Sequence, residues 1–133
     1  MPSDYEAALH LWQETPGLAL SEADSAADIG QFLSRNDGLS FVAEAGTELI
    51  GTCLCGHDGR RGFIYHLAVR HDCRCQGIGR ALAERCLAQL KAAGIAKCHL
   101  FVLADNRQGL AFWEHIGFQG RADISICSCN IGQ

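Results

Sequence analysis

Apolar residues recur with a helical period in the first part of the chain. One stripe runs from Tyr5 to Trp12 and stops before Pro16, and a second runs from Ser21 to Leu33 and stops at an Asn-Asp-Gly turn. Spacings of three and four residues place such positions on one face of a helix, and Ser and Asp favour helix starts. The pattern therefore predicts two helices that form a pair.

The middle of the chain carries shorter apolar segments of a different kind. Residues 39–45, 48–56 and 62–69 are rich in apolar and β-branched side chains, with Gly46-Thr47 and Asp58-Gly59 between them. Short Gly-containing connections of this kind join antiparallel neighbours. We expect a three-stranded antiparallel meander.

The last part of the chain alternates between helical and extended patterns. Apolar spacing predicts a helix over 78–93 that Gly94 stops, and another over 108–116 before Gly117. Residues 97–103 and 122–128 are predicted as strands. A meander followed by alternating helices and strands indicates an α/β fold with a mixed sheet.

Composition narrows the class of protein. The chain has 133 residues, 48% of them hydrophobic, which suits one domain over residues 1–133. A formal net charge of −4 lacks the basic excess of nucleic-acid-binding proteins. The sequence has no run of 18 apolar residues and no basic-then-apolar start, so we expect no membrane span or membrane partner, no secretion signal and a cytoplasmic location.

Eight cysteines raise the question of a metal site. Zinc sites usually use C-x-x-C pairs or His partners at set distances, whereas C-x-C within a strand only places two thiols on one face. We therefore expect small buried thiols and no metal. The three C-x-C pairs are Cys53 with Cys55, Cys73 with Cys75, and Cys127 with Cys129.

The segment from Arg74 to Gly79 reads R-C-Q-G-I-G between a predicted strand and a predicted helix. A glycine-rich turn at a helix start gathers backbone N–H groups at the positive end of the helix dipole, which suits a phosphate. No Lys-Ser or Lys-Thr follows, so this is not a Walker loop, and Leu82 stands where a dinucleotide fingerprint needs glycine.

Two further segments complete a pattern. The strand before the loop reads I-Y-H-L-A-V, and Asn106 to Phe118 reads N-R-Q-G-L-A-F-W-E-H-I-G-F. With R-C-Q-G-I-G, they make the chain resemble the GNAT superfamily of acyl-coenzyme A N-acyltransferases over residues 4–126. The resemblance implies a single GNAT-like domain with a mixed, mostly antiparallel sheet, whose central parallel strands splay apart and are flanked by helices.

We expect the family's first strand to be absent, because Pro2-Ser3-Asp4 looks like the loop that follows it. Its absence would leave the sheet edge at residues 39–44 unpaired, and proteins seldom leave such an edge bare. We predict that another chain or the C-terminal tail covers it, and a homodimer is one such arrangement.

The resemblance implies acetyl-CoA as acyl donor and no metal. Backbone N–H groups from Gln76 to Arg80 would bind the pyrophosphate with help from Arg74, and the pantetheine arm would lie along the strand edge. Trp113 would pack against that arm. The implied cofactor-binding residues are Leu67, Ala68, Val69, Arg74, Cys75, Gln76, Gly77, Ile78, Gly79, Arg80, Asn106 and Trp113.

The implied reaction is direct attack of a primary amine on the thioester in a ternary complex, with a backbone N–H near Leu67 polarising the carbonyl. An alkylamine with a pKa of about 10.4 is mostly protonated at pH 7, so a base is expected. His66 is the first candidate catalytic residue, although it could be an ordinary sheet residue. Trp113 stands where many family members carry an acid tyrosine. The thiolate therefore either departs unassisted, because the pKa of its thiol is about 8.5, or is assisted by another residue such as Tyr65.

Two other functions fit the same motifs. One is a non-catalytic CoA or acyl-CoA binding module that acts as a sensor or regulatory partner, and the other is an unrelated phosphate-binding fold. For the enzyme, the sequence allows a small-molecule or a peptide amine as acceptor and does not identify it.

Overall fold

The computed structural model describes residues 2–132 and divides the chain into two compact units. The first extends to Phe101 and the second begins at Val102. A single domain over residues 1–133 therefore stays a prediction.

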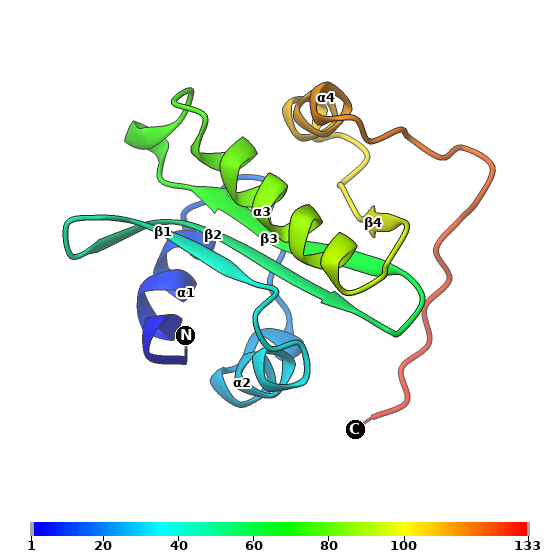
Figure 1. Ribbon diagram of the computed structural model, residues 1–133, viewed down its shortest axis with the longest axis horizontal. Coiled ribbons are helices and arrows are strands. Elements are labelled where there is room, and N and C mark those ends of the chain that lie inside the picture. Colours follow the sequence, from blue (N-terminus) through cyan, green and yellow to red (C-terminus); the bar gives the residue numbers. More distant parts are fainter. Residues whose placement is uncertain (1, 133) are drawn as a thin grey trace. The chain divides into compact units, whose positions relative to one another are not determined.

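The first unit is built on a four-stranded sheet with the order β1-β2-β3-β4 (Figure 1). The first three strands pair antiparallel, which confirms the predicted meander, and β3 pairs parallel with β4. The sheet is mixed and the fold is α/β, as the sequence predicts. The strands are β1 (Phe41–Ala45), β2 (Glu48–His57), β3 (Gly62–Val69) and β4 (Cys98–Leu100).

The two parallel strands stay paired only over a short stretch. Their ladder runs from Gly62 opposite Cys98 to Ile64 opposite Leu100, whereas β3 continues to Val69. The predicted strand over 97–103 is thus shortened to three residues. The second half of β3 consequently has a side without a strand partner among the described residues.

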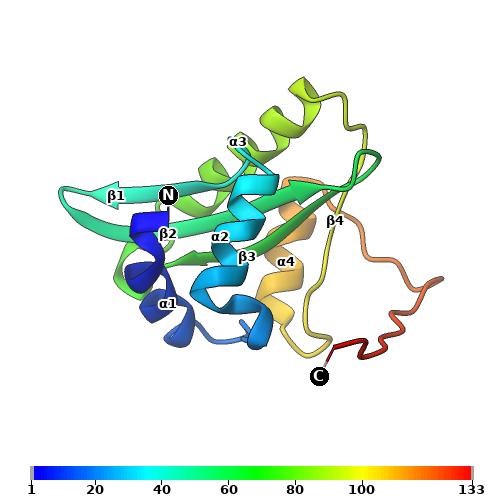
Figure 2. The same ribbon diagram turned by 90° about the horizontal axis from the view of Figure 1, so that it is seen from below.

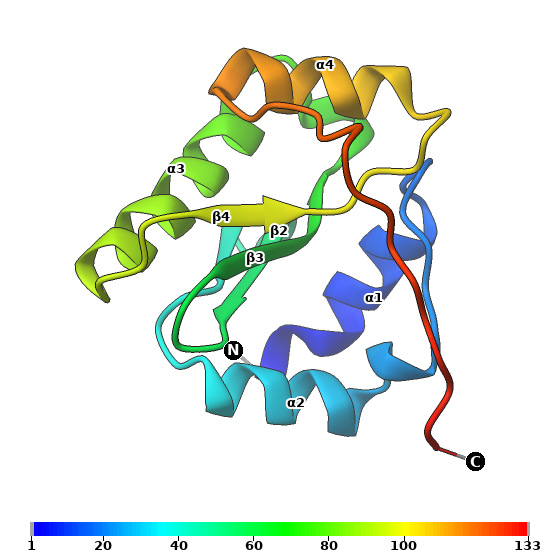
Figure 3. The ribbon, with the colours of Figure 1, turned by 90° about the vertical axis from the view of Figure 1, so that its right-hand side faces the viewer.

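Helices cover both faces of this sheet (Figure 3). The helices α1 and α2 contact one face and form the predicted pair, and α3 packs on the other face. Ser25 caps α2 by accepting the N–H of Asp28, so the predicted start at Ser21 instead opens a separate 3₁₀ turn. The helical segments of this unit are η1 (Pro2–Asp4), α1 (Tyr5–Gln13), η2 (Glu22–Asp24), α2 (Ala26–Arg35), η3 (His71–Cys73) and α3 (Ile78–Ala92).

Strand β2 forms the centre of the core because both of its faces are covered. Leu54 packs with α1 residues on one face, and Cys53 and Cys55 are fully buried on the other, where Cys86 of α3 lies within hydrogen-bonding distance of the Cys53 carbonyl. Hydrogen bonding and burial raise the pKa values of the Cys55 and Cys86 thiols. These cysteines therefore remain protonated and serve packing, as small apolar side chains do.

Gly62 provides a stability test of the α3 packing. A Cβ at Gly62 would lie 2.6 Å from Cδ1 of the buried Leu90, whereas one at Gly30 in α2 would meet no heavy atom within 4 Å. We expect Gly62→Ala to lower the free energy of unfolding by about 1–3 kcal/mol through overpacking. Gly30→Ala should raise it by up to about 1 kcal/mol through helix propensity. Urea denaturation measures both, and equal effects of the two changes would contradict the packing argument.

The second unit contains α4 (Arg107–Ile116) and an extended C-terminal segment. The helix begins one residue before the predicted 108–116, with Asn106 as its N-cap. The prediction of a strand over 122–128 is wrong, because these residues form no strand and Ile124 and Ile126 are 58% and 66% exposed. Alternating side chains alone do not make a strand when no neighbour completes the backbone ladder.

The sheet edge at β1 agrees only in part with its prediction. Among the described residues, β1 pairs with β2 alone and no strand precedes α1 (Figure 2). Residues 122–128, which form no strand, belong to the second unit, so coverage of this edge by the C-terminal tail stays a prediction. The edge carries a bulge between Ala43 and Glu44, and Glu44 is exposed. Coverage by another chain stays a prediction.

Candidate active site

The predicted phosphate loop lies between β3 and α3. Cys75 and Gly77 adopt positive φ angles of 64° and 81°, which turn the chain sharply into the helix. Gly77 is the N-cap of α3, and no side chain between residues 2 and 132 caps the helix. The first intrahelical bond is donated by Ala81 to the Gly77 carbonyl, so the N–H groups of Ile78 to Arg80 are left without helical partners. This arrangement suits an anion.

The arginines around the loop have distinct roles. Arg74 donates from Nε to the carbonyl of Val69 at 3.0 Å, which holds its guanidinium at the end of β3. Arg80 pairs with Glu84 one helical turn later at 3.0 Å. Arg70, which was not among the predicted site residues, bridges Glu48 and Asp72. The guanidinium groups of Arg74 and Arg80 thus lie next to the loop. Arg70 instead stabilises the segment before the loop through its two ion pairs.

The backbone of β3 alternates between two sides. Arg70 donates its N–H to the Ile50 carbonyl, and Ala68 pairs with Thr52, so these residues direct their backbone groups toward β2. Successive residues of an antiparallel strand alternate in this respect, so Leu67 and Val69, on either side of Ala68, direct their backbone N–H and C=O groups away from β2. The Arg74 bond to Val69 agrees with this direction. Leu67 and Val69 therefore offer backbone groups on the side where β4 has diverged, and Ala68, a predicted cofactor contact, does not.

A bulge interrupts β3 at His66. The register slips between Thr52 and Leu54, so that His66 and Leu67 oppose one residue of β2, and His66 has a φ of 49°. The Thr52 hydroxyl donates to the His66 carbonyl at 2.8 Å and so replaces the bond that the ladder loses. A positive φ in a residue other than glycine is strained and usually has a functional reason.

The bulge places two consecutive side chains on one face of the sheet. Tyr65 packs against Phe32 of α2, and His66 packs against Trp12 of α1. Neighbouring residues of a regular strand would point to opposite faces. The structure thus brings together Tyr65 and His66, the two predicted catalytic residues.

His66 forms a close pair with Asp24. Its Nε2 lies 2.6 Å from Oδ1 of Asp24, and the two side chains are only 15% and 13% exposed. Trp12 contributes a ring at 4.7 Å and donates its Nε1–H to Thr52. Sequence analysis missed Asp24, because Ser21-x-x-Asp24 indicates only a helix-start capping box.

Tyr65 lies in an aromatic group that is partly open to solvent. Its ring lies near those of Phe32, Phe63 and Phe101, and Tyr65 and Phe101 are 36% and 57% exposed. Burial, with a smaller contribution from Cys98, raises the pKa of the Tyr65 hydroxyl. The hydroxyl therefore stays protonated at neutral pH and can donate a proton but not accept one.

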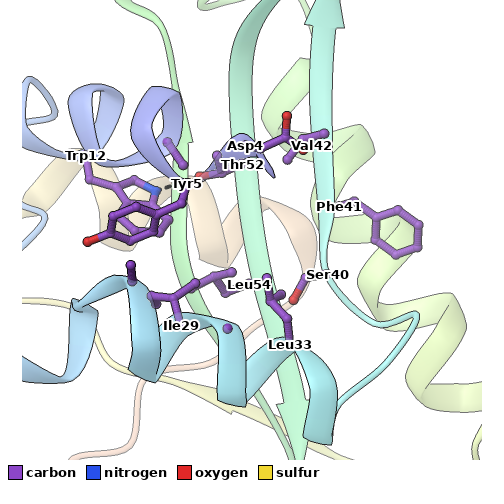
Figure 4. Close-up of a pocket in the computed structure, with 13 residues that line it drawn as sticks. Asp4, Tyr5, Trp12, Ile29, Leu33, Ser40, Phe41, Val42, Thr52 and Leu54 are labelled. Atoms are coloured by element: carbon purple, nitrogen blue, oxygen red, sulfur yellow. Dashed lines mark hydrogen bonds between the residues drawn. The ribbon is translucent and has the colours of Figure 1, made fainter. Parts of the chain in front are cut away.

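A cavity of about 210 Å³ lies on the same face, between α1, α2 and the strands β1 and β2 (Figure 4). Tyr5 and Trp12 line it from α1, and Ile29 and Leu33 line it from α2. Its walls are mainly apolar, so it does not suit a phosphate. It adjoins the His66 network through the shared Trp12 ring.

Asn106 and Trp113 belong to the second unit. Asn106 accepts the N–H of Gly109 on Oδ1 at 3.0 Å and so caps α4. Trp113 packs edge-on against Phe112 and Phe118. Both residues have a structural role within their own unit, and their predicted contacts with a cofactor stay predictions.

The described residues also bear on metal binding and on membrane insertion. No group of three or more His, Cys, Asp or Glu side chains in this part of the chain is arranged to hold a metal ion. None of the helices between residues 2 and 132 is long and apolar enough to cross a membrane. Burial raises the pKa of Cys98 to about 12, so this thiol is not a reactive thiolate.

Comparison with known proteins agrees with the resemblance found in the sequence. The model of the acetyltransferase (GNAT) family matches residues 5–118. A protein named Acetyltransferase ECA0875 from Pectobacterium atrosepticum is 35% identical over 116 residues, which cover 87% of this chain and 82% of that protein.

Two solved structures share the fold. Ard1 from Thermoplasma volcanium has a TM-score of 0.81 at 20% identity, over 92% of this chain and 80% of that one. The PaiA N-acetyltransferase from Thermoplasma acidophilum, solved in complex with coenzyme A, has a TM-score of 0.77 at 20% identity, over 89% and 85% of the two chains. At these identities the likeness extends to the fold alone.

Proposed function

Since the chain belongs to the acetyltransferase (GNAT) family, we propose that it transfers an acetyl group from acetyl-CoA to a primary amine in a ternary complex. Acetyl transfer in general is the activity of this family. The donor, the amine acceptor and the direct attack are the parts that we propose.

The proposal rests on two features that occur together. One is a helix start whose backbone N–H groups have no helical partners, and the other is the edge of β3 that β4 leaves. N–H groups of Ile78 to Arg80 lack helical partners, and among the described residues β3 has no strand partner on the side from which β4 diverges. A donor with a pyrophosphate and an amide-bearing arm needs both features. Loop residues Arg74 to Arg80 would hold the pyrophosphate, and the backbone of Leu67 and Val69 would hold the arm.

Acetyl-CoA supplies the thioester carbonyl that the amine attacks and the thiolate that leaves. The N–H of Leu67, directed away from β2, would polarise the carbonyl oxygen as an oxyanion donor. His66 would take a proton from the amine, and Tyr65, whose raised pKa keeps it protonated, would donate one to the thiolate. Trp113 would pack against the arm, and Asn106 would contact it.

A primary amine fits the face that carries Tyr65 and His66. Such an amine arrives mostly as an ammonium ion at neutral pH. The partly exposed rings around Tyr65 and the Asp24 carboxylate both favour a cation. Small-molecule and peptide amines both meet this requirement.

A panel of amines tests the proposal. The wild-type protein with acetyl-CoA should release free thiol when primary amines are supplied, and the acetylated amine should appear by mass spectrometry. Release without any acetylated product would reject the acetyl transfer to amines. Tight binding of acetyl-CoA with no turnover over the whole panel would favour the sensor or regulatory module instead.

The remaining predictions concern the surroundings of the enzyme. We propose a cytoplasmic location and no nucleic-acid partner, on the acidic composition and net charge of −4. A homodimer is proposed because β1 pairs on one side only among the described residues.

A further inference from the structure

Asp24 stands beside His66 in a way that local structure does not require. The His66 Nε2 to Asp24 Oδ1 distance is 2.6 Å, and both side chains are largely withdrawn from solvent. A contact this short between a ring nitrogen and a carboxylate is a charge-assisted hydrogen bond. It joins the turn between α1 and α2 to the bulge of β3, residues 42 positions apart in the sequence.

The Asp24 carboxylate is oriented independently of His66. Its second oxygen, Oδ2, accepts the Ser21 N–H at 2.9 Å as half of a capping box. The Asp24 carbonyl accepts the Tyr5 hydroxyl at 2.7 Å. The carboxylate is therefore already in place, and the ring of His66 adapts to it.

This arrangement selects one tautomer of neutral His66. An ionised carboxylate can only accept, so the proton lies on Nε2 and the lone pair lies on Nδ1. Within residues 2–132, no group forms a hydrogen bond with Nδ1 of His66. In the same residues, every side-chain N or O atom that is fully buried has a hydrogen-bond partner. An unpaired Nδ1 therefore cannot be fully buried. Nδ1 is therefore reached by solvent and is available as a proton acceptor.

We propose that Asp24 is the positioning residue of the general base His66, which it holds as the Nε2–H tautomer with Nδ1 toward the amine. The inference rests on the proposed function. The ammonium ion first loses one proton to water. As the nitrogen of the resulting neutral amine bonds to the carbonyl carbon, its second proton passes to Nδ1. The carbon–sulfur bond then breaks, and the thiolate keeps its electron pair and takes a proton from Tyr65 or water. Asp24 stays ionised and stabilises the imidazolium.

Asp24→Asn is the informative variant. Its side-chain oxygen can still accept the Ser21 N–H, so the turn is kept, but its NH₂ group faces Nε2 and must donate to it. That reverses the tautomer and places the proton on Nδ1. We expect kcat to fall at least 100-fold, while the dissociation constant for acetyl-CoA changes less than twofold. Glu22→Gln, which removes an exposed carboxylate from the same turn, is the matched control and should change neither quantity.

A readout independent of turnover decides the proposal. Long-range ¹H–¹⁵N spectra of the histidine rings, with the His66 signals assigned by their loss in His66→Asn, should show Nε2–H in wild type and Nδ1–H in Asp24→Asn. Nδ1–H in wild type, or an Asp24→Asn variant as active as Glu22→Gln, would overturn it. If Asp24→Asn does not fold, the wild-type spectrum still decides. If wild type acetylates no amine, the proposed function fails, whereas the spectrum still tests the tautomer.

Discussion

Gly77→Asp is expected to abolish acetyl-CoA binding while leaving the protein folded. Gly77 is the N-cap of α3 with a φ of 81°, and a Cβ there would meet no heavy atom within 4 Å. Aspartate adopts this left-handed conformation more readily than most residues, at a cost in backbone strain, and is a favoured N-cap. Its carboxylate would take the free N–H groups of the first turn and place a negative charge where the pyrophosphate should lie. The N–H groups of the first turn would thus gain hydrogen-bond partners, and the pyrophosphate would lose its binding site.

Thermal shift and calorimetric titration measure this effect. Acetyl-CoA at 100 times its dissociation constant should stabilise wild type by about 2.7 kcal/mol, which raises Tm by roughly 10 °C. Gly77→Asp should show no shift. Gly38→Asp, which places aspartate at a φ of 79° with open space in the turn after α2, is the control and should bind normally. Unchanged affinity in Gly77→Asp would rule out the loop as the phosphate site.

His66→Asn is expected to lower kcat by about 10²–10⁴, the usual contribution of a general base. Asparagine tolerates the φ of 49° that His66 adopts, so the bulge and the Thr52 bond to the backbone carbonyl should persist. The asparagine side chain cannot accept the amine proton. Acetyl-CoA affinity should stay within a factor of two, because the ring faces α1 and η2 and not the loop.

Two comparison variants separate chemistry from structure. Tyr65→Phe keeps the aromatic group and should cost less than His66→Asn. A thiolate, whose parent thiol has a pKa of about 8.5, can leave without help, whereas the attacking amine must give up a proton to a base. His66→Gly relieves the backbone strain and opens space beside Asp24, so added imidazole should restore part of its turnover. Turnover of His66→Asn within threefold of wild type would show that His66 is an ordinary sheet residue.

The local residue pattern was sufficient to predict most of the helices and strands. The stripes of the first two helices, the Gly-containing turns of the meander and the start of α3 at Ile78 are set by residues within a few positions of each other. The loop from Arg74 to Gly79 is equally local, and the resemblance that it carries with the Asn106 to Phe118 segment led to the family. The predicted strands were wrong where a neighbouring strand decides the outcome. The strand over 97–103 is shortened to β4, and residues 122–128 form no strand.

The sequence by itself determined the fold class, the glycine-rich start of α3 and the family, because periodicity, glycine placement and motif spacing are local properties. Only the tertiary structure decided how the candidate chemistry is assembled. The bulge that turns Tyr65 and His66 to one face depends on Thr52 of a neighbouring strand. The pairing of His66 with Asp24 depends on packing α1 and η2 against β3. Contacts between residues remote in sequence leave no periodic pattern, because they arise only when burial brings separate elements together.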